Sequence, residues 1–420
     1  MTRLDGPRAL AMLAAASTLV TAGCWPQPGG NPANSYWNAI ESELTVDNVA
    51  TLHQVWSAEG DLDAVFGRHV LGMTGGGDGT TPGTGFVHVT SLDAGTGAQN
   101  WSTDIAPGGI AQGLVTGSAV VVGDQVWAEW LANAIGPGGT HACAGGGSRL
   151  DLETGAPAGT TNLLNAIMTT GNLVAVRETS FLQDCTFGPT SGVRVLDGAT
   201  RAPIWETNEH GLRPVAAGNQ LVIAENDALK SFALSGCGAP QCQPVWTSSV
   251  AGPNNVSVEH LAADGDRLYA MGIHLGTFEM IGVDISDGSV AWRTPGPAPL
   301  TGGIAAFDGI VYTTAGVKLL AYDGEGCVPG CQPLWTGVLP GGVITTNIAG
   351  AGGVVYALTE DGTVSAFDAK GCGAPSCPPL AQVSLGGKPS GTLIVASGHV
   401  YASVTATTPP LSRIVALGPA

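Results

Sequence analysis

Short apolar segments, each interrupted by a glycine-bearing turn, recur along most of this chain. Each copy has an apolar run, a turn that contains glycine, and a second apolar run. The eight copies are AVFGRHVLG (64–72), VVVGDQVWA (120–128), MTTGNLVAV (168–176), VAAGNQLVI (215–223), AADGDRLYA (262–270), AAFDGIVYT (305–313), AGAGGVVYA (349–357) and VASGHVYAS (395–403). The pattern predicts eight β-hairpins, because short apolar runs bounded by turn residues are typical of strands.

A second pattern follows most of these hairpins and leads from an aspartate through a turn to a tryptophan. The tryptophans that end such segments are Trp101, Trp205, Trp246, Trp292 and Trp335, whereas Gly159 and Ala381 stand at the corresponding position in two copies. The aspartate can accept hydrogen bonds from turn amides, and the glycine permits a positive φ. A large ring at a fixed offset in each copy is expected to pack between neighbouring units.

The repeat length identifies the architecture that these units predict. Gly67 and Gly398 lie 331 residues apart, which gives about 47 residues per copy, the length of a four-stranded propeller blade. The first segment, ELTVDNVATLHQVW (43–56), brings Trp56 to the docking position without an aspartate strand, and LSRIVALGPA (411–420) is an aspartate-type strand without a tryptophan strand. The sequence therefore predicts an all-β fold, a single eight-bladed β-propeller over 44–420, closed by its N- and C-terminal strands.

The aspartate-to-tryptophan pattern resembles the tryptophan-docking repeat of quinoprotein-type (PQQ-like) β-propellers. The positions that carry the resemblance are Leu92, Asp93, Thr96, Gly97 and Trp101, then Asp284, Gly288 and Trp292, and Asp197 with Trp205, where Arg201 stands at the glycine position. The resemblance covers about 44–420 and implies the fold. Quinoprotein dehydrogenases of this type carry an adjacent Cys-Cys disulfide against the cofactor, and no such pair occurs in this sequence. Binding of PQQ is therefore not expected.

The first 24 residues read as an export signal. Arg3 and Arg8 precede an apolar run over 9–20, and the segment ends in Thr-Ala-Gly-Cys24. The apolar run is shorter than the roughly 20 residues that a spanning helix needs. The ending resembles a bacterial lipobox, although Thr21 stands where leucine is usual. We expect a lipoprotein signal peptide over 1–24, a lipid on Cys24, a flexible tether over 25–43 and a location at the outer face of the cell membrane. The alternative is an ordinary cleaved signal.

The cysteines suit an oxidising compartment. Of the nine, eight remain once Cys24 is assigned to the lipid, and six of these form close pairs in turns: Cys237/Cys242, Cys327/Cys331 and Cys372/Cys377. A zinc site needs four converging ligands, and a redox C-x-x-C motif has tighter spacing. We therefore expect a disulfide across each loop. By elimination, Cys143 and Cys185 form the remaining pair.

The sequence contains no motif that identifies a catalytic or metal site. The formal net charge of −18 excludes a phosphate-binding surface, so no nucleic-acid partner is expected. Two functions remain. The first is a monomeric, non-catalytic scaffold for a protein or cell-envelope ligand, similar in plan to the propeller lipoprotein of outer-membrane protein assembly. The alternative is a quinoprotein-like or other enzyme with its site in the central funnel. The longest departures from the repeat, 73–85, 131–147 and 178–192, are the expected partner surface.

Overall fold

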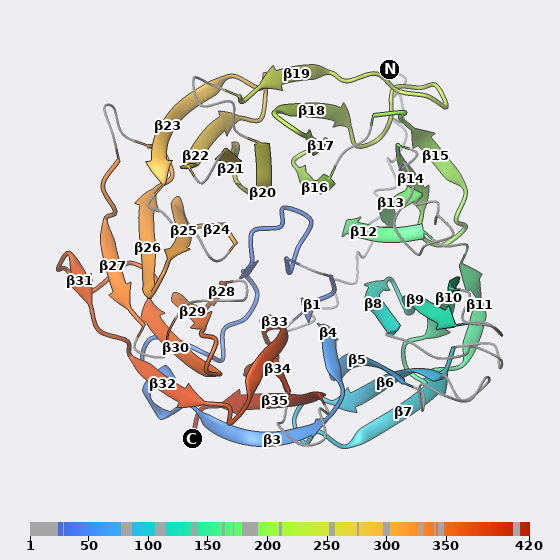
Figure 1. Cartoon of the computed structure of the whole chain (residues 1–420), viewed down its shortest axis with the longest axis horizontal. Helices are drawn as coiled ribbons and strands as arrows, with labels where there is room; N and C mark the ends of the chain where they lie inside the picture. Colours follow the sequence, from blue (N-terminus) through green and yellow to red (C-terminus); the bar gives the residue numbers. More distant parts are fainter. Residues whose placement is uncertain are drawn as a thin grey trace, which may run out of the picture.

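The computed structural model of the chain forms a ring of eight β-sheets, shown in Figure 1. It describes residues 24–27, 29–76, 86–105, 115–135, 141–161, 164–170, 172–178, 192–209, 212–251, 257–274, 277–296, 303–326, 331–339, 342, 348–405 and 412–420. Each sheet contains four antiparallel strands, and the first of the four lies nearest the centre of the ring. The prediction of a single eight-bladed propeller is confirmed.

The first four blades follow one another along the chain. Blade 1 contains β4 (Asp61–Phe66), β5 (His69–Gly76), β6 (Phe86–Asp93) and β7 (Gln99–Asp104), with β1 (Cys24–Trp25) added at its inner edge. Blade 2 contains β8 (Val115–Val122), β9 (Gln125–Ile135), β10 (His141–Asp151) and β11 (Pro157–Thr161). Blade 3 contains β12 (Leu164–Thr170), β13 (Leu173–Glu178), β14 (Val193–Asp197) and β15 (Pro203–Glu206). Blade 4 contains β16 (Leu212–Ala217), β17 (Gln220–Glu225), β18 (Ala228–Ala233) and β19 (Trp246–Ser249).

The last four blades complete the ring. Blade 5 contains β20 (Ser257–Asp264), β21 (Arg267–His274), β22 (Thr277–Asp284) and β23 (Val290–Gly296). Blade 6 contains β24 (Ala305–Phe307), β25 (Ile310–Ala315), β26 (Lys318–Asp323) and β27 (Trp335–Val338), with β31 (Ser376–Cys377) at its outer edge. Blade 7 contains β28 (Ala349–Ala351), β29 (Val354–Leu358), β30 (Thr363–Asp368) and β32 (Ala381–Ser384), with β2 (Trp37–Asn38) at its inner edge. Blade 8 contains β33 (Lys388–Ala396), β34 (His399–Thr405), β35 (Ser412–Gly418) and β3 (His53–Glu59).

The ring closes as the sequence predicts. Strand β3, from the start of the chain, pairs antiparallel with β35, from its end, between Glu59↔Arg413 and His53↔Gly418. The only helix in the described residues is the single 3-10 turn η1 (Val49–Thr51), which lies just before β3. Because the two ends of the chain pair within one sheet, β35 has a partner strand on each side and the ring is closed.

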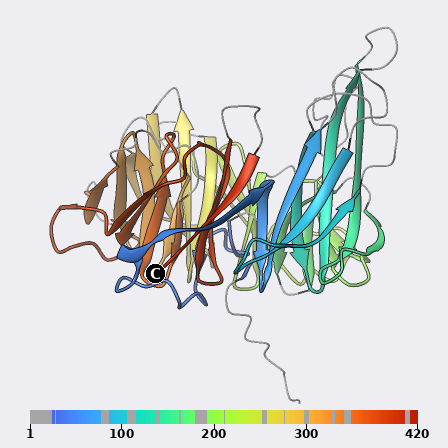
Figure 2. The same ribbon diagram turned by 90° about the horizontal axis from the view of Figure 1, so that it is seen from below.

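The two faces of the ring differ in the connections that they carry. One face, here called the turn face, bears the turns between first and second strands, such as Gly67–Arg68, and the aspartate turns between third and fourth strands, such as Asp93–Ala98. The opposite face, here called the hairpin face, is where the paired strands β9 and β10 end at Ile135 and His141. Figure 2 shows these two long strands rising above the rest of the ring, with the C-terminus on the other side.

The predicted tryptophans lie in the seams between blades. Each indole N–H donates to a backbone carbonyl in the turn after the third strand of the following blade, which for Trp56 of blade 8 is blade 1. The six pairs are Trp56–Ala94 (2.9 Å), Trp101–Leu152 (2.9 Å), Trp205–Leu234 (3.0 Å), Trp246–Ile285 (2.9 Å), Trp292–Gly324 (3.0 Å) and Trp335–Ala369 (3.2 Å). All are buried except Trp246, which is partly buried. The hydrogen bond satisfies the polar end of each ring while its apolar surface fills the seam.

The tryptophan ring of each of these blades packs against the turn glycine of the following blade. A Cβ atom on Gly97 would lie 2.7 Å from the ring of Trp56, and one on Gly326 would lie 2.3 Å from the ring of Trp292. Both glycines also have positive φ, at +71° and +80°. The motif therefore requires glycine twice, once for the turn and once for close approach of the ring. Only the first requirement is visible in the sequence.

The seam between blades 2 and 3 lacks both the docking tryptophan and the turn glycine. Gly159 stands where the tryptophan of blade 2 would be, and Arg201 stands where blade 3 would have its turn glycine. The Arg201 guanidinium reaches back and donates to the carbonyl of Thr160 at 2.7 Å, while its backbone keeps a φ of +62°. This exposed hydrogen bond links the two blades where the ring is missing, at the cost of a strained backbone, while the Arg149 guanidinium of blade 2 lies against Gly159 itself.

Substitutions of Arg201 are expected to separate these two effects. Arg201→Ala loses the bond to Thr160 and keeps a strained backbone, so it should lower the free energy of unfolding by about 1–2 kcal/mol. Arg201→Gly loses the same bond but relieves the strain, and it should be close to neutral. Paired chemical denaturation curves measure the difference. Equal midpoints for the two variants would contradict the role given to the backbone.

Candidate functional site

The central channel of the propeller is occupied by the protein's own N-terminal segment. Residues 25–27 and 29–38, here called the channel plug, contact the innermost strand of each blade in order around the ring (Figure 1). The contacts run from Trp25 paired with Val65, through Pro26 with Val121, Gln27 with Thr169, Pro32 with Ala216, Ala33 with Ala263, Ser35 with Ala306 and Tyr36 with Gly350, to Asn38 with Val395. The plug therefore links all eight blades.

Most of these contacts are hydrogen bonds to backbone groups of the inner strands. In blades 2, 4, 5, 6 and 7 a plug carbonyl accepts from an inner-strand N–H at 2.7–3.0 Å, and in blade 3 the Gln27 side chain accepts from the N–H of Thr169. Trp25 is completely buried, and Gln27 and Asn38 are 1% and 3% exposed. An inner strand has a free edge toward the channel, so the plug satisfies groups that would otherwise need water.

The plug is folded on itself as well. The Asn31 side-chain amide donates to Ser35 Oγ at 2.6 Å and to the carbonyl of Trp37 at 2.8 Å, and the N–H of Tyr36 donates to the carbonyl of Gly29 at 3.0 Å. Gly29 has a φ of +79°, and Asn34 has a φ of +49°. Glycine and asparagine adopt this region most easily, so the composition of the segment encodes tight turns.

This placement corrects the expectation of a flexible tether over 25–43 with no core to join. The plug is buried in the ring, and the residues that follow it are also held: Glu41 is 5% exposed and accepts from the N–H of Gly398 at 2.8 Å. Cys24, the predicted lipid site, lies in β1 beside Phe66 and is half-buried. The predicted signal residues 1–23 lie outside the described residues, and the lipid remains a prediction.

The cysteine loops form disulfides and also cover the edges of neighbouring blades. Cys237–Cys242 and Cys372–Cys377 are bonded, with Cα–Cα distances of 5.7 and 5.6 Å. The second loop adds β31 alongside β27 of the preceding blade, and in the first the N–H of Cys242 donates to the carbonyl of Glu206 in β15 at 2.9 Å. Each of these two loops thus pairs with the outermost strand of the blade before it. Covering such an edge removes a surface on which other chains can add strands.

The structure describes only some of the other cysteines that are predicted to form disulfides. Cys331 is disulfide-bonded, and its N–H donates to Thr294 Oγ1 of blade 5 at 3.2 Å. Its predicted partner Cys327 lies outside the described residues, as does Cys185. Cys143 lies within β10, but its side chain is not among those described. The Cys143–Cys185 pair therefore remains a prediction.

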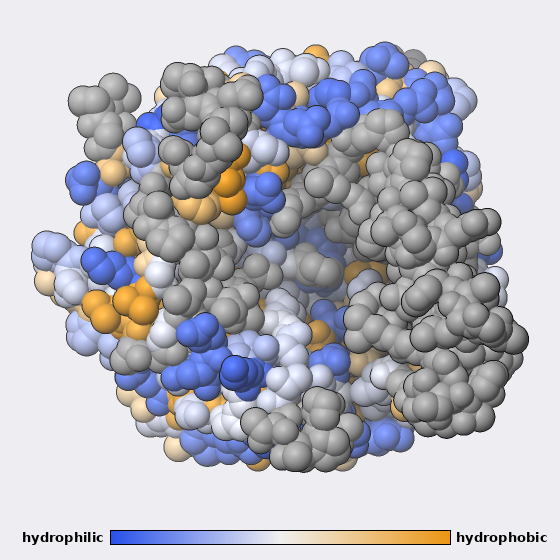
Figure 3. All heavy atoms as spheres, in the orientation of Figure 1, coloured by the Kyte–Doolittle hydropathy of each residue, from blue (hydrophilic) through white to orange (hydrophobic). Residues whose placement is uncertain are grey.

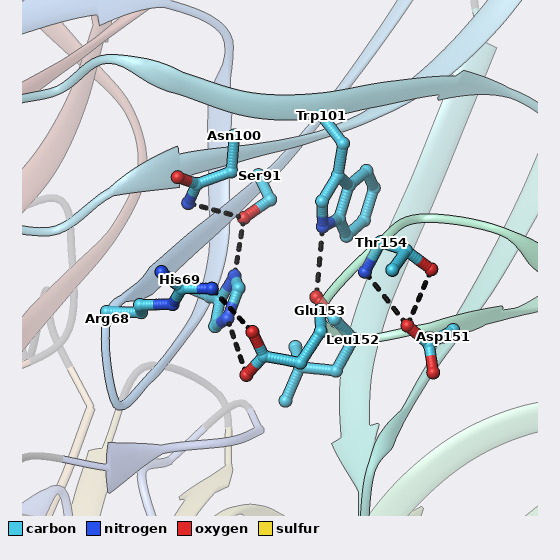
Figure 4. Close-up of polar contacts among 9 residues, drawn as sticks. All are labelled: Arg68, His69, Ser91, Asn100, Trp101, Asp151, Leu152, Glu153 and Thr154. Carbon is cyan, nitrogen blue, oxygen red and sulfur yellow. Dashed lines mark hydrogen bonds and ion pairs between the residues drawn. The ribbon is translucent and has the colours of Figure 1, made fainter.

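A serine, a histidine and a glutamate meet in the seam between blades 1 and 2 (Figure 4). The His69 ring lies 2.8 Å from Ser91 Oγ through Nδ1 and 3.2 Å from Glu153 Oε1 through Nε2. Arg68 bonds the same carboxylate at 2.6 Å, and this hydrogen bond first, then the one from His69, holds the pKa of Glu153 below its usual range. Sequence reading missed this cluster, because its members are more than 20 residues apart and form no local motif.

The cluster has the order of a nucleophile, a base and an acid, but it lacks access for a substrate. Ser91 is 0% exposed and His69 2% exposed, and Asn100 donates to the same serine oxygen at 3.2 Å. A nucleophile must reach the atom that it attacks, and both of these side chains are buried from solvent. The cluster is best interpreted as polar packing beside Trp101.

One polar cleft opens in the seam between blades 8 and 1. Its volume is about 570 Å³, and its lining includes Asp61, Thr74, Phe86, His88 and Gln99. The Phe86 and His88 rings stack at 4.7 Å. Its lining also includes Glu59, and the two carboxylates would repel an anionic ligand.

Where its residues are described, the face of the ring in Figure 3 carries no single large apolar patch. Figure 3 shows one face of the molecule, on which hydrophobic residues form small patches separated by hydrophilic ones. Within the described ranges, no group of three or more histidine, cysteine, aspartate or glutamate side chains could hold a metal ion. Over the same residues, no helix is long and apolar enough to cross a membrane.

The repeat matches a known sequence profile over part of the chain. The sequence profile described as "Outer membrane protein assembly factor BamB" (PQQ_2) matches residues 189–372. Over these residues the repeat is similar to the PQQ-like type. No curated protein sequence matches the chain.

Solved structures of other proteins show a fold similar to that of this propeller. BamB from Moraxella catarrhalis is 16% identical, with a TM-score of 0.55 over 87% of this chain and 97% of its own. A europium-containing methanol dehydrogenase is 12% identical, with a TM-score of 0.57 over 94% and 98%. The quinohemoprotein alcohol dehydrogenase from Comamonas testosteroni is 12% identical, with a TM-score of 0.59 over 94% and 81%. At these identities the likeness is one of fold.

Proposed function

We propose that this protein is a membrane-anchored, extracytoplasmic propeller that serves as a binding or assembly scaffold for protein partners and catalyses no reaction. The observation that carries the proposal is the channel plug. The funnel of a propeller is where the enzymatic alternative would place its site, and here plug residues from Trp25 to Asn38 bind the inner strands of all eight blades. The profile match to an assembly factor supports the scaffold function.

The residues in the channel do not fit PQQ. The inner-strand N–H groups of Val121, Ala216, Ala263 and Ala306 bond to plug carbonyls, so they are not available to a cofactor. Plug side chains such as Gln27, which is 1% exposed, are buried among these strands. An enzyme of the quinoprotein type is the alternative that the fold likeness favours, and it would require the plug to leave.

Cofactor titration of the purified protein tests the non-enzymatic part of the proposal. PQQ with calcium is added while absorbance and the melting temperature are recorded, and alcohol oxidation with an artificial electron acceptor is measured in parallel. We expect no saturable change in the spectrum, no shift in melting temperature and no turnover. Binding with a defined stoichiometry, or steady turnover, would establish the enzymatic alternative instead.

The predicted export signal and the disulfides support a location outside the cytoplasm. Disulfides persist in oxidising compartments, and the structure contains those of Cys237–Cys242 and Cys372–Cys377. Membrane fractionation of cells that express the full chain measures the anchor. The natural chain should sediment with membranes, and Cys24→Ala should be released, because the predicted lipid attaches to that thiol. Equal release of both forms would remove the anchor from the proposal.

The strands β9 and β10 are the proposed partner surface, since they extend beyond the ring on the hairpin face (Figure 2). Deleting 132–140 should abolish capture of a partner that the natural chain retains on affinity beads, with an unchanged melting temperature. Asp287→Ala, an exposed turn-face position, is the matched control and should retain capture. Retention by the deletion variant would move the partner site to another part of the molecule.

A further inference from the structure

We infer that the turn face of the ring lies against the membrane, and that the hairpin face is presented to the partner. This inference rests on the membrane attachment in the proposed function. It holds for any attachment through residues that precede Trp25, whether a lipid on Cys24 or a retained apolar run over 9–20. The direction in which the N-terminal segment enters the channel determines the orientation.

The entry point of the segment lies at the turn face. Strand β1 runs antiparallel to β4, with Cys24 beside Phe66 and Trp25 beside Val65. Phe66 is the last residue of β4 before the Gly67–Arg68 turn, which belongs to the turn face. Any group attached at or before Cys24 therefore emerges from this face.

The segment leaves no slack between the attachment and the ring. Trp25 is completely buried, and the Pro26 carbonyl already accepts from the N–H of Val121 at 2.9 Å. A free tether over 25–43 would let the ring move tens of ångströms from its anchor, at about 3.3–3.6 Å per extended residue. Because the first residue after Cys24 is fixed in the channel, the turn face must stay within a few ångströms of Cys24.

The partner-facing side follows from the same geometry. Strands β9 and β10 have eleven residues each, pair over their whole length and end at Ile135 and His141 on the side opposite Cys24. Figure 2 shows them rising away from the side on which the C-terminus lies. A ring held by its turn face would therefore direct this hairpin away from the bilayer.

The charge of the turn face sets which membranes it approaches closely. Its exposed basic side chains include Arg68, Arg201 and Lys370, of which Arg68 is ion-paired with Glu153. They are outnumbered by its exposed acids, which include Glu43, Asp124, Glu153, Asp266, Asp287, Asp308, Asp323 and Glu325. These carboxylates are repelled by anionic lipids over about a Debye length, whereas a zwitterionic surface does not repel them. The contact should therefore be closest on zwitterionic vesicles and should tighten as salt rises on anionic ones.

Native lysines make the orientation measurable without added labels. Lys370 follows β30 on the turn face, and Lys318 and Lys388 begin β26 and β33 on the hairpin face. All three are exposed. Acylation by an amine reagent, followed by peptide mass spectrometry, gives the reaction rate of each lysine. The full-length membrane-derived protein is compared in zwitterionic vesicles and in detergent, after flotation confirms attachment.

The expected result is protection of one lysine only. The rate of Lys370 should fall several-fold in vesicles, with Lys318 and Lys388 unchanged. A floating protein in which Lys370 reacts as in detergent, or in which the other two are protected, overturns the orientation and leaves the proposed function in place. Failure to float overturns both. Flotation of Cys24→Ala with Lys370 protected supports the orientation and shows that a retained apolar run is sufficient for attachment without the lipid.

Discussion

Deletion of residues 25–38 is expected to abolish cooperative folding of the propeller. The plug provides at least five backbone hydrogen bonds to inner strands and buries Trp25 completely. Each buried N–H left without a partner costs about 1–3 kcal/mol, and a buried tryptophan side chain contributes about 3–5 kcal/mol. Their sum reaches the 5–15 kcal/mol that typically separates folded from unfolded protein. Thermal unfolding followed by circular dichroism measures the effect.

Two point variants of the same region provide the controls for this deletion. Trp25→Ala removes the most deeply buried ring of the plug and should lower the unfolding free energy by about 3–5 kcal/mol. Ile40→Ala changes a side chain that is 51% exposed and should alter stability by no more than about 0.5 kcal/mol. A deletion variant that melts within a few degrees of the natural protein would show that the plug is dispensable.

The second large effect is expected at the blade seams, where Trp292→Ala should cost about 3–5 kcal/mol. Trp292 is 5% exposed, donates to the carbonyl of Gly324 at 3.0 Å and lies against Gly326. Replacing it leaves a cavity between blades 5 and 6 and a carbonyl without its donor. Denaturant unfolding of the purified variant measures the loss.

The comparison for Trp292 is removal of one disulfide loop. Cys372→Ser/Cys377→Ser opens a bond between residues only five apart, so the chain-entropy loss is about 2 kcal/mol at most. Val245→Ala, at a side chain that is 63% exposed, should be nearly neutral. If the disulfide variant melts at a lower temperature than Trp292→Ala, the loop stabilises the ring more than its size explains. Its pairing with the outermost strand of the preceding blade would then be the main source of that stability.

The amino-acid sequence by itself determined the features that repeat locally. The hairpin turns, the aspartate turns and the tryptophans recur at a nearly constant spacing, because each blade packs against its neighbours in the same way. Blade count, ring closure by β3 and β35, and the disulfides Cys237–Cys242 and Cys372–Cys377 could therefore be predicted without any long-range contact. The structure of a repeated unit can be inferred from its sequence, because each copy packs against the same kind of neighbour.

Only the tertiary structure decided what fills the channel and the irregular seams. The plug has no periodicity, and its glycines, prolines and asparagines look like those of a linker until eight strand edges converge around it. Asn38 and Val395 meet across 357 residues of chain, and Arg201 bonds to the preceding blade only because the carbonyl of Thr160 lies opposite. Such contacts depend on which edges the closed ring brings together. No local pattern contains that information, because the partners of these residues exist only after the ring has formed.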